Sequence, residues 1–261
     1  MKTIGLPRRL ALAGALLAGL AAACQTGGGE GVAGIVAASI ERHGGDGFDR
    51  VHLTWDFRGV PFEVIRYDGQ FRYQRTVEDS LGTPVVEVMQ NEGSWIEVAG
   101  QDREVDAQAR ARLETAVNSV VYFGFLPFRL DDPPVRAADL GTQEVAGQPY
   151  RKVEITFEQE GGGPDWEDRF IYWFHEADGT LDYLAYREAA DVETTRFRRA
   201  VNRREIGGLL VQDYENYTGD PDVGDVADYD RLFEAGALRL VSMVEFDNLA
   251  VRVPAGPPPP R

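Results

Sequence analysis

The side chains best suited to bind a metal or to act as a general base are the three histidines, His43, His52 and His175. Catalytic metal sites usually combine two or three histidines with a carboxylate at close spacing, and the chain contains no H-E-x-x-H motif. His52 and His175 occupy polar positions of strand patterns, and His43 ends a helical pattern, where an imidazolium would face the negative end of the helix dipole. We therefore predict structural roles for all three, with no metal and no other cofactor.

Acidic residues gather around the glycines and proline at 161–164; they are Glu158, Glu160, Asp165, Glu167 and Asp168. Carboxylates in such a loop could bind calcium, with Asp165, Glu167 and Asp168 as the candidate ligands. Two of the carboxylates could instead act as the acid and base of a hydrolase. The plainer interpretation is a long acidic hairpin loop in an acidic protein, and we favour it.

A third group consists of five arginines in nine residues: Arg196, Arg198, Arg199, Arg203 and Arg204. We expect a hairpin whose arginines pair with nearby acids. The alternative is a docking patch for anionic headgroups or an acidic partner, because guanidinium groups bind phosphate well. No G-x-S-x-G motif, P-loop or Cys/His nucleophile arrangement occurs in the chain. The sequence therefore indicates no catalytic residues for nucleophilic or phosphoryl-transfer chemistry.

The one cysteine, Cys24, follows a segment with the layout of a secretory signal peptide, residues 1–23. The segment starts with basic residues, continues with an uninterrupted apolar run of 11 residues, Leu10–Leu20, and ends in alanines. A transmembrane helix needs about 20 apolar residues, so this run is too short to span a membrane. A single cysteine forms no internal disulfide and no cysteine-based zinc site.

The stretch LAAAC at 20–24 resembles the lipobox of bacterial lipoproteins, although Ala21 stands where leucine is usual. The resemblance implies that the Cys24 thiol carries a diacylglycerol and its amino group a further acyl chain such as palmitate. Because Gln25 rather than an aspartate follows, it also implies location at the outer membrane. Residues 24–34 would form the lipidated cysteine and a glycine-rich tether. The competing interpretation is an ordinary signal peptide and an incidental free thiol.

The net charge of −16 limits the partners of the whole protein. An anionic surface repels nucleic-acid phosphates and anionic membrane surfaces, so we expect no nucleic-acid partner. An apolar content of 43% with 27% charged residues is typical of a globular protein.

The body of the chain alternates apolar and polar residues with the period of two that indicates antiparallel strands. The pattern is clear over Val51–Phe57 and Val153–Phe157. Phe170–Phe174 is apolar at every position and predicts a strand covered on both faces. Turn signals separate such segments at 67–69, 80–82, 91–93, 177–179 and 207–208.

Three stretches read as helices, namely 32–42, 106–122 and 228–234. We therefore predict a mainly β (α+β) protein: one domain at 35–253 built as a strongly curved antiparallel sheet or open half-barrel of about ten strands with two or three helices. A helix must cover the apolar concave face, and 106–128 is the candidate cap. The proline-rich end, 254–261, is expected to be a solvated tail.

Aromatic residues gather on the apolar faces of these elements. Trp55, Phe57, Phe71 and Tyr73 lie on the strands, and Phe123, Phe125 and Phe128 lie on the predicted cap. They form either a plain core or the lining of a cavity for an acyl chain or another apolar ligand.

Several long motifs resemble a family of bacterial lipoproteins catalogued as a domain of unknown function; they are HGG (43–45), TWDFRGVPFEV (54–64), NSVVYFGFLPFRLDDPPV (118–135), FEQEGGGPDWEDRFIYWF (157–174), LDYLAY (181–186) and TRFRRAVNRREIGGLLVQDYENY (195–217). The family implies no catalytic residues. More distantly, the opening helix, HGG and strands are similar in layout to the LolA/LolB-like lipoprotein-sorting half-barrels, which hold acyl chains in a curved sheet.

These observations favour a lipid-anchored protein of the cell envelope that binds or carries an apolar ligand without catalysis. One alternative is an interaction or assembly module with a packed core. The other is a hydrolase that uses the carboxylates near residue 161.

Overall fold

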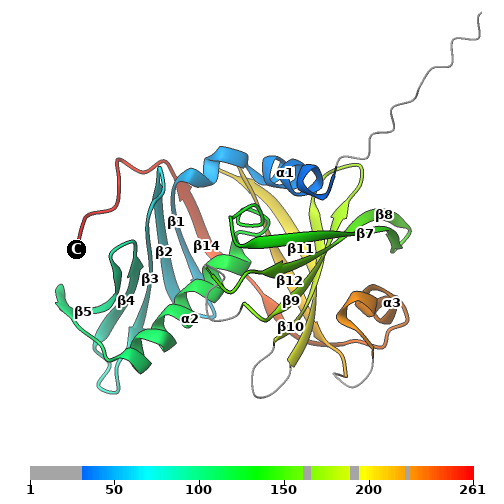
Figure 1. Cartoon of the computed structure of the whole chain (residues 1–261). Helices are drawn as coiled ribbons and strands as arrows, with labels where there is room; N and C mark the ends of the chain where they lie inside the picture. The colour runs from blue at the N-terminus through cyan, green and yellow to red at the C-terminus, as the bar shows by residue number, and fades with distance from the viewer. Residues whose placement is uncertain (1–30, 161–165, 189–193, 221–223) are drawn as a thin grey trace, which may run out of the picture.

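The computed structural model describes residues 31–160, 166–188, 194–220 and 224–261. Its strands form two antiparallel sheets of seven strands each. The sheets face each other across an apolar interior, and α2 lies across the space between them (Figure 1). The signal segment, Cys24 and Asp165 lie outside the described residues.

The first sheet has the spatial order β14 (Asp247–Arg252), β1 (Arg50–Phe57), β2 (Val60–Tyr67), β3 (Gln70–Glu78), β4 (Pro84–Gln90), β5 (Gly93–Val98) and β6 (Gln101–Arg103). The second has the order β13 (Arg239–Val244), β12 (Leu209–Thr218), β11 (Thr194–Ile206), β10 (Leu181–Glu188), β9 (Arg169–His175), β8 (Gln148–Phe157) and β7 (Val135–Val145). The mainly β, antiparallel and open architecture is confirmed, with the strands divided between two sheets instead of one, and the 14 described strands correct the estimate of about ten.

One chain segment joins the two sheets at neighbouring edges. Strand β13 borders the second sheet and β14 borders the first, with Glu245 and Phe246 between them. Asp213 Oδ1 accepts a hydrogen bond from the Phe246 amide at 3.1 Å, and Arg204 Nη2 donates to the Phe246 carbonyl at 3.0 Å. These bonds fix the bend at which the chain passes from one sheet to the other.

The predicted turns connect strands as expected. At the β2–β3 connection, Asp68 and Gly69 have φ angles of 49° and 83°. A two-residue hairpin turn of this type needs positive φ at both positions, which aspartate tolerates and glycine favours. The Asp-Gly signal in the sequence therefore specifies both the turn and the pairing register of β2 with β3.

The three predicted helices are also confirmed as α1 (Val32–His43), α2 (Ala107–Gly124) and α3 (Tyr229–Glu234), with short 3-10 turns η1 (Gly45–Asp49) and η2 (Val226–Asp228). Helix α2 begins after Asp106, whose Oδ1 accepts a hydrogen bond from the Ala109 amide at 2.8 Å. Such a cap satisfies one of the free amides of the first turn and fixes where the helix starts.

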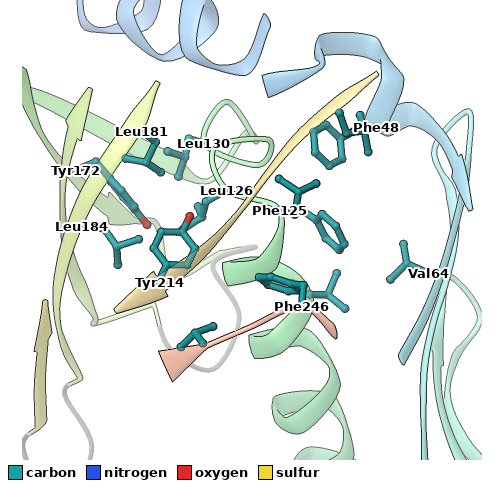
Figure 2. Packing of buried hydrophobic residues seen from close by; sticks show 14 of the residues in the cluster. Phe48, Val64, Phe125, Leu126, Leu130, Tyr172, Leu181, Leu184, Tyr214 and Phe246 are labelled. Atoms are coloured by element: carbon teal, nitrogen blue, oxygen red, sulfur yellow. The ribbon is translucent and has the colours of Figure 1, made fainter. Parts of the chain in front are cut away.

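Buried side chains form two cores, one on each face of the second sheet. The larger core fills the space between the sheets (Figure 2). The smaller one lies on the outer face, beneath α3. Alternate residues of β9 enter different cores, with Tyr172 in the inner one and Trp173 in the outer one. This confirms the prediction that Phe170–Phe174 is covered on both faces.

His43 ends α1 as predicted, but its ring is a neutral imidazole, so the expectation of an imidazolium at the helix dipole is wrong. The side chain is buried, with 1% of its surface exposed, and its Nε2 accepts a hydrogen bond from the Leu181 amide at 3.2 Å. Burial, together with the positive charges of Arg203 and Arg42, lowers the pKa of His43 to about 4. The neutral ring therefore joins α1 to the start of β10.

The lowered pKa of His43 predicts a loss of stability in mild acid. The unfolded chain binds this proton near pH 6.5, whereas the folded chain binds it only near pH 4. The contribution is therefore complete above pH 6.5 and is lost as the pH falls toward 4. We expect wild type to lose about 3 kcal/mol more than His43→Gln between pH 7 and pH 4. Chemical denaturation at both pH values measures this difference, and equal losses in the two proteins would contradict it.

Candidate ligand-binding interior

Helix α2 and the segment after it occupy the space between the two sheets. The buried side chains that they contribute are Leu113, Val117, Val121, Phe125, Leu126 and Leu130. Figure 2 shows Phe125, Leu126 and Leu130 between strands of the two sheets. The predicted cap, 106–128, therefore lies where the sequence placed it, and it fills the interior as well as covering it.

Three of the predicted ligand-binding aromatics meet at the first sheet. The rings of Trp55 and Phe125 lie edge to face at a centroid distance of 5.4 Å. Phe62 stacks on Trp55 at 5.3 Å and contacts Phe57 at 6.3 Å. Trp55 has 2% of its surface exposed, and its Nε1 has no hydrogen-bond partner among the described residues.

Arg66 connects three further predicted residues. Phe71 and Tyr73 are neighbours on β3 at a centroid distance of 4.6 Å. Arg66 Nη1 donates to the Tyr73 hydroxyl at 2.5 Å, and its guanidinium lies 4.8 Å from the centre of the Phe128 ring. A guanidinium over an aromatic face is attracted by the electron-rich ring.

Phe123, the seventh predicted residue, contacts the second sheet instead. It stacks on Tyr186 of β10 at 5.1 Å and lies 6.1 Å from Phe170 of β9. All seven aromatics thus belong to the inner core or pack against it. In this conformation they contact one another and neighbouring side chains, so their role as the lining of a ligand cavity stays a prediction.

Two hollows open at the first sheet, and Trp55 is the one of these seven aromatics that lines either of them. Their volumes are about 280 Å³ and about 400 Å³, and Glu63 and Gln74 line both. The larger one is bordered by the C-terminal residues, where Gln90 Nε2 donates to the Pro259 carbonyl at 2.9 Å and the Arg261 guanidinium lies 4.7 Å from the Trp95 ring. The proline-rich end is therefore docked on the sheet rather than solvated.

Most of the arginine run pairs with acids, as expected. Arg199 donates to both carboxylate oxygens of Glu215 at 2.8 Å. Arg203 forms an ion pair with Asp182, and Arg204 pairs with Asp213 at 3.1 Å. Arg196 donates to the Thr195 carbonyl at 2.8 Å. Arg198 differs from the others, because it is buried and its guanidinium lies over the aromatic rings of Phe123 and Tyr186.

The acidic loop is only partly described, because Asp165 lies outside the described residues. At its base, Arg136 forms an ion pair with Glu158. Glu167 is exposed, and the side chain of Asp168 is engaged in an interaction of its own. Among the residues that the structure describes, no three His, Cys, Asp or Glu side chains gather as a metal site would require. Calcium binding and acid–base chemistry in this loop therefore receive no support from the described part.

The two remaining histidines make local polar contacts. His52 Nε2 lies 2.6 Å from Glu63 Oε1 on the outer face of the first sheet. His175 Nδ1 accepts a hydrogen bond from the Asp178 amide at 3.2 Å.

In the described part of the chain, no helix is long and apolar enough to span a membrane.

Fold and site together define a class of protein: an open antiparallel β protein of two facing sheets, with a helix filling its aromatic interior. The chain belongs to the Family of unknown function (DUF6503), whose model matches residues 46–246. This confirms the family resemblance of the long motifs. None of the curated proteins compared with the chain matches it.

Among solved structures, the chain is similar to a LolA superfamily protein from Nitrosomonas europaea, with a TM-score of 0.49 and 10% identity over 85% of this chain and 94% of that one. A DUF1329 family protein from Desulfovibrio piger matches with a TM-score of 0.39 and 10% identity over 85% and 93% of the two chains. The lipoprotein LppX from Mycobacterium tuberculosis matches with a TM-score of 0.27 and 12% identity over 60% and 89%.

Proposed function

We propose that this protein is an exported lipoprotein, anchored at the outer membrane through acyl chains on Cys24, that binds an apolar, acyl-chain-like ligand between its two sheets. Binding would proceed by shape and burial, without catalysis. The residues between Cys24 and the start of α1 at Val32 would form the tether that lets the folded domain reach away from the membrane surface.

The observation that supports ligand binding is how the interior is filled. One helix and the residues after it occupy the space between the sheets, and other buried residues of the same core come from the inner faces of both sheets. An α-helix with its side chains is about 10–12 Å across. If α2 moves outward, the space that it leaves is long enough and wide enough for an acyl chain, and aromatic side chains border it.

Apolar contact is the main attachment of α2 to the sheets. In the described part of the chain, the Ala109 amide of α2 donates to Asp106 and the Arg110 side chain donates to Glu104, and both acceptors lie just before the helix. The hydroxyls of Tyr122 on α2 and Tyr172 on β9 lie close enough to perturb each other's pKa, but neither makes a hydrogen bond of normal geometry. An apolar ligand could replace such contacts at little cost, since it offers the sheets equivalent apolar surface.

The filled interior also favours one rival, an interaction module with a permanently packed core. The two functions differ in what the purified protein does with lipid. A carrier should take up a fluorescent fatty acid and should retain lipid from the producing cell, visible by mass spectrometry. A protein that carries no lipid and takes up no fatty acid would be the interaction module.

A further inference from the structure

Arg198 is a buried cation on the inner face of β11. It has 9% of its surface exposed. Its guanidinium carbon lies 4.4 Å from the centre of the Phe123 ring and 5.3 Å from that of Tyr186. Nη2 donates to the Tyr186 hydroxyl at 3.1 Å, whereas Nε has no hydrogen-bond partner among the described residues. The guanidinium thus lies between α2 and the second sheet with an unused donor.

The partners of Arg198 are unusual for a buried arginine. Among the residues that the structure describes, its polar contact is the one with Tyr186, and no carboxylate forms an ion pair with it. Its neighbour on the opposite face, Arg199, makes two hydrogen bonds to Glu215. Burying a charge without a counter-ion is costly. The chain has 43 acidic residues, so the lack of one here does not reflect a shortage of acids.

Two further hydroxyls in this region lack a hydrogen bond of normal geometry. The hydroxyl oxygens of Tyr122 and Tyr172 are buried and interact with each other, so an outward movement of α2 would leave the Tyr172 hydroxyl without that neighbour. Burial raises the pKa of Tyr122 to about 12 and that of Tyr172 well above 10. Both groups therefore stay protonated at physiological pH. The positive charge of Arg198 opposes this rise in the pKa of Tyr172, so the two side chains are close enough to interact electrostatically.

We infer that Arg198, with the hydroxyl of Tyr172, binds the anionic head of a single-chain amphiphile after α2 has moved outward and taken Tyr122 with it, and that this head is a carboxylate. A carboxylate accepts several hydrogen bonds and forms strong charge-assisted bonds with a guanidinium. One cation neutralises one negative charge, which favours a carboxylate over a phosphate monoester carrying about −1.5 to −2. The apolar chain would lie along Phe170 and Tyr186 of the second sheet, in the space that α2 leaves. This inference rests on the proposed function and specifies its ligand as a long-chain fatty acid.

The test compares a long-chain fatty acid with the alcohol of the same chain length. Titration calorimetry would use the mature chain from residue 24, with Cys24→Ser so that no acyl anchor is attached. Wild type should bind the acid about 10- to 100-fold more tightly than the alcohol, as expected for charge-assisted hydrogen bonds. Arg198→Met should remove that preference, so that the acid binds no more tightly than the alcohol. Arg199→Met, on the opposite face of the same strand, is the matched control and should retain the preference.

Tyr172→Phe keeps the ring and removes one hydroxyl, so it tests the site with little risk to folding. It should weaken fatty-acid binding several-fold, in line with the loss of one hydrogen bond to a charged group. Equal affinity for acid and alcohol in wild type, or an unchanged preference in Arg198→Met, would overturn the inference while the proposed function stands. Binding of neither ligand would instead overturn the proposed function. Tight binding of acetate or inorganic phosphate alone would assign the site to a small free anion and also overturn the inference.

Discussion

Replacing Cys24 with serine should move the protein from the membrane fraction to the soluble fraction. Each methylene of an acyl chain buried in the bilayer contributes about 0.8 kcal/mol, and two chains anchor a protein stably where one does not. Cys24 is the one residue of the chain that can accept a thioether-linked lipid. Without it, the 11-residue apolar run is too short to hold the chain across a membrane.

Fractionation of cells into membranes and soluble protein measures this effect. Gln25→Asn is a suitable control, since it changes the neighbouring residue and leaves the thiol in place. If Cys24→Ser stays with the membranes to the same extent as wild type, the anchor assignment is wrong.

Replacing Asp230 with alanine should lower the free energy of unfolding by about 3–5 kcal/mol, as expected when one member of a buried ion pair is removed. Asp230 Oδ2 lies 3.2 Å from Lys152 Nζ and accepts a hydrogen bond from Trp173 Nε1 at 3.2 Å. The side chains of Asp230 and Lys152 are 1% and 8% exposed. The variant therefore leaves a buried ammonium without its counter-ion and an indole N–H without its acceptor beneath α3.

The double variant Lys152→Met/Asp230→Leu separates this explanation from a loss of packing. It removes both charges and restores apolar volume, so it should recover most of the stability lost in Asp230→Ala. Chemical denaturation of the three proteins provides the comparison. A double variant as unstable as the single one would show that the charge imbalance is not the cause.

Strands and turns could be predicted because both depend on local sequence. The period of two in β1 and the Asp-Gly pair before β3 specify face and register within a few residues. The edge strands were harder to predict. Strand β6 (Gln101–Arg103) is short and fully exposed, so it has no apolar alternation to detect. The passage of the chain from one sheet to the other depends on two hydrogen bonds of Phe246: its amide donates to Asp213, and its carbonyl accepts from Arg204. Both partners are distant from Phe246 in the sequence.

The candidate site was predictable in part. The inner aromatics followed from alternation, and the cap followed from the apolar end of α2. The buried position of Arg198 could not be predicted in this way. Phe197 beside it fits a core position, and in a strand with one buried face the next residue, Arg198, would point to solvent. In fact both faces of β11 are covered, with Phe197 in the outer core and Arg198 in the inner one. The burial of His43 depends likewise on the distant β10.

The central claim is that the space between the sheets can receive an acyl chain. Trp55 reports on it directly, because it is buried there against Phe125. Trp95 is equally buried but lies on the outer face, beneath Arg72 and Arg261. The measurement is tryptophan fluorescence of the mature chain during titration with a fatty acid brominated along its chain, since bromine quenches only a nearby indole.

We expect saturable quenching in wild type and in Trp95→Phe, and most of it should be lost in Trp55→Phe although mass spectrometry still detects the bound acid. No quenching in wild type, or quenching that persists unchanged in Trp55→Phe, would contradict a ligand between the sheets.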